Sequence, residues 1–150
     1  MVLLELSPYY GWVVIATGIG TTITHFYMGS VVMAARDKYS VQLPNLYAVP
    51  GFHKNADEFN RIQRGHQNFV EGLVGFVTMS LIGGIKYPLA NAIGSVLFCV
   101  GSVLYQKGYS DCTLDVKDAR MKKGGPIKYI GLLTALYSTG AVAYSLITSA

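Results

Sequence analysis

This sequence contains few charged residues. Only 13% of its 150 residues are Asp, Glu, Lys or Arg, whereas about a quarter of the residues are charged in ordinary soluble domains. Cysteine is scarce as well, and the two that occur, Cys99 and Cys112, would lie about 20 Å apart along a helix, too far for a disulfide. These shortages exclude an ordinary soluble domain and a small scaffold held together by disulfides.

Long apolar segments take the place of the missing charges. Hydrophobic residues make up 51% of the chain, and four runs with very few ionisable side chains lie at 9–35, 69–85, 87–105 and 129–150. Three of them reach the roughly 20 residues that a helix needs to span a bilayer, and the run 69–85 reaches it with the polar stretch before it. We therefore predict one all-α, integral membrane domain over residues 1–150. Its helices are expected at about 8–36, 57–84, 88–110 and 126–148.

The connections between these helices predict how they are arranged. The turn at Lys86-Tyr87-Pro88 is short enough to make the second and third helices antiparallel neighbours, so we expect an up-down four-helix bundle. Most basic residues fall in the first and third connections, namely Arg36, Lys38, Lys54, Lys107, Lys117, Arg120, Lys122 and Lys123. Basic connections face the cytoplasm, so both termini are expected on the opposite, luminal side. This distribution is typical of a membrane protein, and we expect no nucleic-acid partner despite the net charge of +4.

One polar stretch, residues 59–71, stands at the start of the second helix. Within it Arg61, Arg64, Asn68 and Glu71 recur at spacings of three and four, which puts them on one face of a helix. Ionisable groups inside a membrane are costly and normally face the interior of a bundle or a wet cavity. Guanidinium, amide and carboxylate groups together suit a small zwitterion that carries carboxylates, an ammonium and peptide groups.

Two further features allow alternative interpretations. Arg36 ends the first helix and could extend to the membrane interface or turn inward towards a ligand. Tyr105 and Tyr109 are four residues apart and therefore share a helical face. They could belong to an interfacial aromatic belt or direct two phenols at the polar cleft. His25 lies in the middle of the first span, where we expect a hydrogen-bonded structural role.

The sequence resembles the MAPEG family, the membrane-associated proteins of eicosanoid and glutathione metabolism, and within it the branch of type 3 microsomal glutathione S-transferases. The matching pieces are Ala35-Arg36, Lys38-Tyr39, Pro44-x-x-Tyr47-Ala48, Phe59-Asn60-x-x-Gln63-Arg64-Gly65-His66-Gln67-Asn68-x-x-Glu71 and Tyr105-x-x-Gly108-Tyr109. The resemblance implies a homotrimer in the endoplasmic reticulum. Glutathione would bind as co-substrate between subunits, near the cytosolic ends of the helices, and no metal is implied.

The resemblance also implies roles for individual residues. The glutathione-binding set would be Arg36, Arg64, His66, Asn68, Glu71, Tyr105 and Tyr109. A cation near the start of the fourth helix would stabilise the glutathione thiolate; Arg120 is preferred because a guanidinium stays charged when partly buried, and Lys123 is the alternative. Tyr105 or Tyr109 would donate a hydrogen bond to the sulfur or to the leaving oxygen. His66 points away from the Arg64–Asn68 face by about 160°, so it could bond within its own subunit or meet a neighbour's ligand.

The implied activity is that of a membrane glutathione transferase and glutathione-dependent peroxidase. It would act on lipophilic electrophiles or lipid hydroperoxides that arrive from the membrane lipid. The alternative is a non-enzymatic lipid-presenting protein like the five-lipoxygenase-activating member of the family. Asp37 stands where relatives that conjugate leukotriene epoxide carry a second basic residue, which disfavours that substrate. Gly72-Leu73-Val74 replaces the aromatic-proline segment of relatives, which suggests that a ligand-contacting aromatic residue and a kink are missing.

Overall fold

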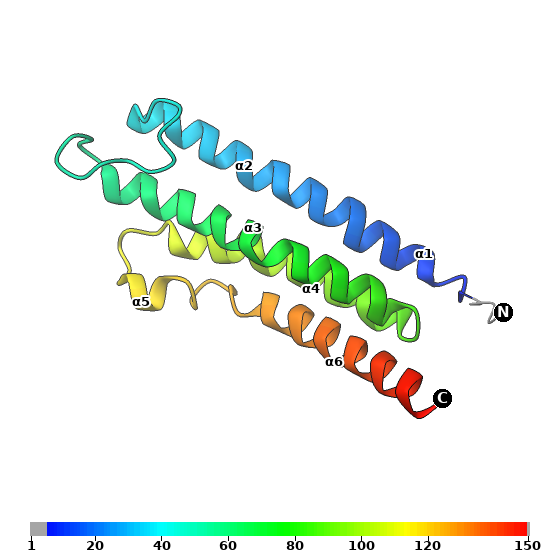
Figure 1. The fold of residues 1–150 in the computed structure, drawn as a ribbon. Coiled ribbons are helices and arrows are strands. Elements are labelled where there is room, and N and C mark those ends of the chain that lie inside the picture. The colour runs from blue at the N-terminus through cyan, green and yellow to red at the C-terminus, as the bar shows by residue number, and fades with distance from the viewer. Residues whose placement is uncertain (1–5, 150) are drawn as a thin grey trace.

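A computed structural model describes residues 6–149, and within that range the regular structure is entirely helical (Figure 1). The first long segment is one continuous helical rod with a π-helical turn near its start. The elements are α1 (Tyr10–Val13), the π-turn η1 (Val14–Ile19), α2 (Gly20–Tyr39), α3 (Ala56–Gly84), α4 (Pro88–Tyr109), the short α5 (Val116–Ala119) and α6 (Ile127–Thr148). The first rod thus runs to Tyr39, three residues beyond the predicted end at 36.

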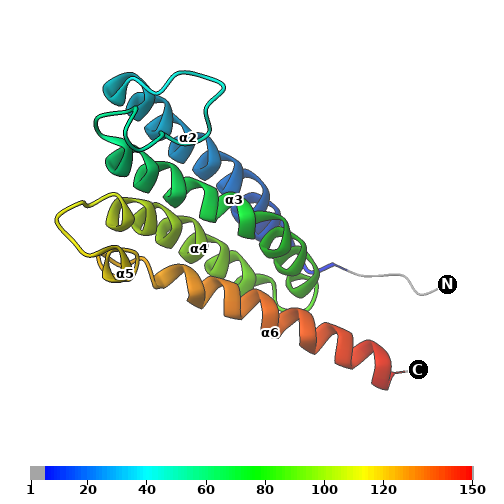
Figure 2. The same ribbon diagram turned by 60° about the vertical axis from the view of Figure 1, so that its left-hand side comes forward.

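The long helical segments lie side by side, and their connections alternate between the two ends of the molecule (Figures 1 and 2). The loop 40–55 and the segment 110–126 with α5 lie at one end, which we call the loop end. The α3–α4 turn lies at the other end, as do the start of α1 and the end of α6. Helices α3 and α4 contact each other, and both also contact α2 and α6. Within the described residues, α2 and α6 do not contact one another.

Local sequence explains where several helices begin and end. α2 stops at Ser40, whose φ of 56° is left-handed, and the backbone N–H of Val41 then bonds back to the carbonyl of Arg36. α3 carries Asp57 and Glu58 in its first turn, where acidic side chains complement the helix dipole. α4 begins with Pro88, which lacks the N–H that a first-turn residue leaves unpaired.

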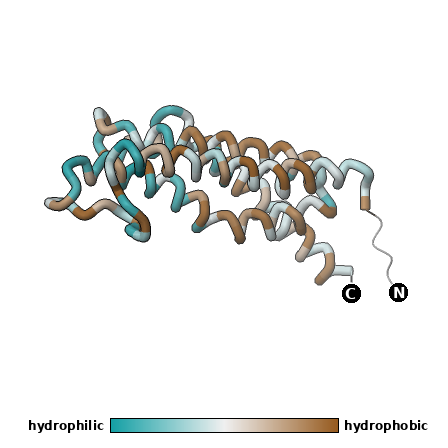
Figure 3. Tube along the Cα trace, turned by 90° about the horizontal axis from the view of Figure 1, so that it is seen from above, coloured by the Kyte–Doolittle hydropathy of each residue, from teal (hydrophilic) through white to brown (hydrophobic). Residues whose placement is uncertain are grey.

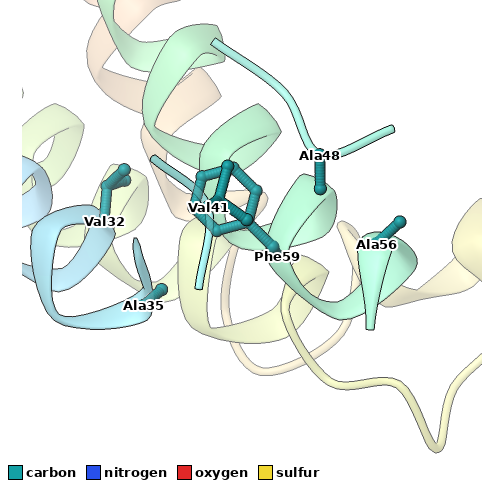
Figure 4. Packing of buried hydrophobic residues seen from close by; sticks show 6 residues of the cluster. All are labelled: Val32, Ala35, Val41, Ala48, Ala56 and Phe59. Atoms are coloured by element: carbon teal, nitrogen blue, oxygen red, sulfur yellow. The ribbon is translucent and has the colours of Figure 1, made fainter. Parts of the chain in front are cut away.

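Two apolar clusters hold the helices and the loop end together. The first joins α2, the loop 40–55 and the start of α3 through Val32, Ala35, Val41, Ala48, Ala56 and Phe59 (Figure 4). The second lies in the middle of the molecule and contains Met28, Phe69, Phe76, Phe98 and Ala135. In it the rings of Phe76 and Phe98 stack with centroids 3.8 Å apart. The first cluster therefore fixes the part of α3 that carries the polar stretch.

Glycines allow α4 and α6 to approach closely. A Cβ added at Gly101 would lie 2.2 Å from the backbone nitrogen of Lys128, and one added at Gly131 would lie 2.2 Å from the carbonyl oxygen of Gly94. Contacts this short are possible only without side chains, as in the tight helix pairs of membrane proteins. The start of α6 is thereby held against the middle of α4.

Hydrophilic residues gather at the loop end, whereas the rest of the molecule is mostly apolar (Figure 3). Within the described residues two helices, α4 and α6, are long and apolar enough to cross a membrane. The other two predicted spans do not meet this measure. The π-turn divides the first rod, α2 ends in Arg36-Asp37-Lys38, and the first half of α3 carries the polar stretch.

Candidate functional site

An ion pair marks the polar face of α3. Arg64 Nη1 lies 2.7 Å from Glu71 Oε1, and the two side chains are 43% and 48% exposed. The two residues are seven apart, which places them about 10 Å from each other along the helix on the same face. Charges at half exposure remain reachable by a ligand.

A buried lysine completes this face from the opposite helix. Lys128, in the first turn of α6, is only 6% exposed, and its Nζ donates a hydrogen bond to Oδ1 of Asn68. The same Nζ lies 3.8 Å from the centre of the Tyr105 ring and 5.1 Å from that of Tyr129. The sequence analysis did not identify Lys128, although it lies at helical spacing from Gly131, Ala135 and Ser138, the small buried residues that α6 packs inward.

Two hollows flank the ion pair. The first, between α3, α4 and α6, has a volume of about 300 Å³ and is lined in part by Asn68, Glu71 and Lys128. The second, at the loop end, has a volume of about 270 Å³ and is lined in part by Arg64 and Tyr109. The ion pair joins them, because Arg64 belongs to one hollow and Glu71 to the other.

The two tyrosines predicted for the site point into the molecule. The rings of Tyr105 and Tyr109 are stacked, with centroids 5.9 Å apart and planes 5° apart. Tyr105 is 6% exposed and lies beneath Lys128, so it does not belong to a lipid-facing belt. Tyr109 lines the loop-end hollow and lies 5.9 Å from the guanidinium of Arg61.

Two arginines bind backbone carbonyls of the loop end. Nη1 of Arg36 donates to the carbonyls of Val41 (3.3 Å) and Asn45 (2.8 Å) within the chain, and its binding of glutathione stays a prediction. Arg61 donates to three carbonyls of the segment after α4, those of Tyr109, Asp111 and Leu114, at 2.7–3.1 Å. Both side chains therefore hold loops in place at the loop end.

His66 bonds within its own chain. Its Nε2 lies 3.3 Å from Nδ1 of His25, which joins α3 to α2 and gives His25 the hydrogen-bonded role that we expected. The pair lies away from the Arg64–Glu71 face, and neither histidine lines either of the hollows beside that face.

The two candidate thiolate cations lie in the segment before α6. Lys123 Nζ donates to Oδ2 of Asp111, and this bond with those from Thr113 holds the pKa of the Asp111 carboxyl well below its usual range. Arg120 is exposed at the end of α5. Neither residue lines the hollow that contains Asn68 and Glu71. The backbones of Arg120 and Tyr105 both adjoin Gly125, so Arg120 lies near one member of the predicted site.

Comparison with protein families gives a match that covers most of the chain. The model of the MAPEG family matches residues 14–144. That range contains each of the residues discussed in this section.

Proposed function

The chain belongs to the MAPEG family, and on that premise we propose that it is a membrane glutathione transferase with glutathione-dependent peroxidase activity. Proteins of this family generally bind glutathione and act as membrane oligomers. The proposal places the chain in the type 3 branch of microsomal glutathione S-transferases. It also includes an up-down four-helix bundle, assembly as a homotrimer in the endoplasmic reticulum, and a site that opens to the cytosol.

The observation that carries the proposal is the half-exposed ion pair on α3. Glutathione has two carboxylates, one α-ammonium and two peptide groups. Arg64 suits a carboxylate, because a guanidinium donates two parallel hydrogen bonds to it. Glu71 suits the ammonium, and Asn68 suits a peptide group. Binding would exchange the internal ion pair for two ion pairs with the ligand.

The depth of these charges supports binding between subunits. Glu71 lies about 22 Å along α3 from its start at Ala56. Charges at that depth are costly against acyl chains and normally face protein or a wet cavity. A neighbouring subunit and the ligand would together cover this face, which accounts for exposed charges on a single chain.

Other site residues have supporting roles in this proposal. Arg36 and Tyr109 would form the loop-end wall, and Tyr105 would donate a hydrogen bond to the sulfur or to the leaving oxygen. The thiolate needs a nearby fixed cation, because a free thiol with a pKa of about 8.5 is mostly protonated at neutral pH. The resemblance assigns this cation to Arg120 or Lys123.

An apolar groove offers a place for the second substrate. It has a volume of about 650 Å³ and lies between the first rod and α4, with Ile19, Ile23, Ile93 and Val96 in its walls. A lipophilic electrophile or a lipid hydroperoxide would enter it from the membrane. The same groove suits the rival function, a protein that presents a lipid without chemistry, but that function leaves the Arg64–Glu71 pair and Lys128 unexplained.

A spectroscopic measurement with the purified protein distinguishes the two functions. Glutathione added to the protein in detergent should produce the ultraviolet difference absorbance of a thiolate, and the protein should conjugate glutathione to a generic aryl halide. The double variant Arg64→Met, Glu71→Gln should lose both signals. A wild-type protein that binds a fatty acid but shows neither thiolate nor conjugation would overturn the proposal in favour of the lipid presenter.

A further inference from the structure

The segment 110–126 between α4 and α6 folds back onto the end of α4. A Cβ added at Gly108 would lie 2.6 Å from the carbonyl oxygen of Ala119, and one added at Gly125 would lie 3.2 Å from Cα of Tyr105. Ala119 itself is fully buried. In both ribbon views α5 lies beside the loop end of α4 (Figures 1 and 2). The segment therefore stays at the level of the helix ends.

That level corresponds to the headgroup layer of a bilayer. α4 is uncharged from Pro88 to Tyr105, a stretch about 27 Å long, and a hydrocarbon core is about 30 Å thick. The headgroup layer on each side adds about 5–8 Å. Lys107, two residues beyond Tyr105, lies within this layer, and so does the segment that packs beside it.

Basic side chains outnumber acidic ones at this depth. Residues 107–123 contain five basic and three acidic side chains. The other connection at the loop end, taken with its flanking helix turns as residues 36–58, contains three Lys or Arg and three Asp or Glu. Of the two connections, only the one between α4 and α6 therefore carries an excess of positive charge.

The acidic side chains of the α4–α6 connection already have partners within it. Asp111 is bound by Lys123, and Asp118 lies 4.0 Å from Lys122. Asp115 accepts a hydrogen bond of 2.8 Å from a backbone N–H at the start of α5. The acidic groups are thus engaged locally, and the excess positive charge resides on other side chains.

Three basic side chains carry this excess. Across residues 6–149 no carboxylate lies within ion-pairing distance of Lys107, Lys117 or Arg120, and all three residues are exposed. Met121, next to Arg120, is 50% exposed and adds an apolar side chain. Long basic side chains beside apolar ones are suited to the boundary between acyl chains and headgroups, where the stem contacts the apolar region and the charge stays in the polar layer.

From this geometry we propose that Lys107, Lys117 and Arg120 form a binding surface for the headgroups of anionic phospholipids in the bilayer that the chain crosses. The surface lies at headgroup depth, between the two helices that are long and apolar enough to cross a membrane. Ammonium and guanidinium groups bind phosphate through charge-assisted hydrogen bonds, and each basic residue near an anionic membrane surface strengthens the attraction. This inference does not depend on the proposed enzymatic function.

The test compares two lipids that differ only in their headgroup. Native mass spectrometry of the full-length protein in a neutral detergent measures its affinities for phosphatidylserine and phosphatidylcholine with identical acyl chains. The wild type should prefer phosphatidylserine by about tenfold or more. The double variant Lys107→Gln, Lys117→Gln should lower that preference by about fivefold or more. Arg120 is left unchanged in this variant because it is also a candidate for the thiolate cation.

A matched control removes the same number of charges from the other connection. Lys38→Gln, Lys54→Gln replaces two exposed lysines at the same end of the molecule, where basic and acidic side chains balance. Its preference for phosphatidylserine should stay within about twofold of the wild type. Should either double variant fail to fold, its two single variants take its place. Lys107→Gln and Lys117→Gln should then each lower the preference by about two- to fivefold.

A soluble competitor separates membrane lipid from free phosphate compounds. Glycerophosphoserine has the headgroup of phosphatidylserine but no acyl chains. Added at the concentration of the lipid, it should displace almost no phosphatidylserine from the wild type, because the proposed partner is a headgroup that its own acyl chains hold beside the helices.

Three outcomes would overturn the inference. A wild type that binds both lipids equally has no surface for anionic headgroups. An equal loss of preference in the two double variants would mean that the lipid responds to the net charge of the protein and not to this connection. Displacement of phosphatidylserine by an equal concentration of glycerophosphoserine would identify a site for soluble phosphate compounds. Glutathione binding is a separate measurement, so the proposed function stands in all three cases.

Discussion

The two ends of the helices contain buried polar groups of different kinds. Near the α3–α4 turn they are uncharged, as where Thr17 Oγ1 lies 3.0 Å from Ser80 Oγ and 2.8 Å from Ser95 Oγ. Asn91 and Ser138 likewise bond to each other across α4 and α6. In the half towards the loop end the buried polar groups include the charged Arg36, Arg61 and Lys128, and charged side chains line two hollows there.

The difference separates polar groups that pair with one another in the packing of the helices from charged groups that we propose bind a ligand. In the uncharged networks donors and acceptors satisfy one another, and across the described residues no fully buried side-chain nitrogen or oxygen lacks a partner. Such networks join helices in a membrane at modest energy. The charged end contains structural groups too, such as Arg61, but it also leaves Arg64, Glu71 and Lys128 with capacity for an added molecule. Substitutions at the two ends should therefore change different measurements.

The largest expected effect is on stability, from a charged residue that we assign to structure. Arg61→Met removes three hydrogen bonds to the segment after α4 and should lower the free energy of unfolding by about 3–5 kcal/mol. The measurement is a titration with SDS of the protein in mixed micelles. Arg64→Met is the matched control and should cost less than about 1 kcal/mol, since its ion pair is half exposed. Equal losses in the two variants would contradict the distinction between them.

The next effect is on binding. Arg64→Met should weaken glutathione about 10- to 100-fold, which corresponds to one lost charge-assisted interaction with a carboxylate. Isothermal titration calorimetry on the purified protein measures this affinity. An unchanged affinity would mean that the ion pair is an internal contact only.

A smaller effect is expected in the uncharged region. Ser138→Ala removes a hydroxyl that bonds both the amide nitrogen and the oxygen of the Asn91 side chain. It should lower the free energy of unfolding by about 1–2 kcal/mol, because a buried amide is left partly unpaired. Glutathione affinity should not change. Thr148→Ala, at an exposed hydroxyl, should alter stability by less than about 0.5 kcal/mol.

The smallest effect concerns pH. The pKa of Asp111 is lowered in the folded chain by Lys123 and Thr113. A carboxyl whose pKa falls on folding adds stability above its unfolded pKa and loses it as the pH falls through the folded value. The wild type should therefore have a slightly higher Tm than Asp111→Asn at neutral pH, and the difference should shrink below about pH 4. A difference that grows on acidification would contradict the contact between Asp111 and Lys123.

The sequence predicted the polar face of α3 because charges in an apolar chain stand out, and their spacing places them on one face. It left Arg36 open between extending to the membrane interface and turning inward towards a ligand. The structure adds an internal contact that the sequence could not predict, because the carbonyls bound by Arg36 belong to the irregular loop 40–55, whose path has no periodic signal. Lys128 was missed although its spacing to Gly131 and Ala135 was available. A lysine close to Lys122 and Lys123 in the sequence is easily taken for one more basic residue of the connection. Only its burial and its hydrogen bond to Asn68 show that its side chain points inward.

The separation of α2 from α6 has a mechanical consequence. A displacement of the first rod, for instance when the loop 40–55 shifts, reaches α6 only through α3 and α4. Those two helices are joined by a stacked aromatic pair and by close-packed backbones, which resist deformation. A displacement of α2 should therefore hardly move the ammonium group of Lys128 on α6. The first rod and α6 can each adjust to their surroundings independently.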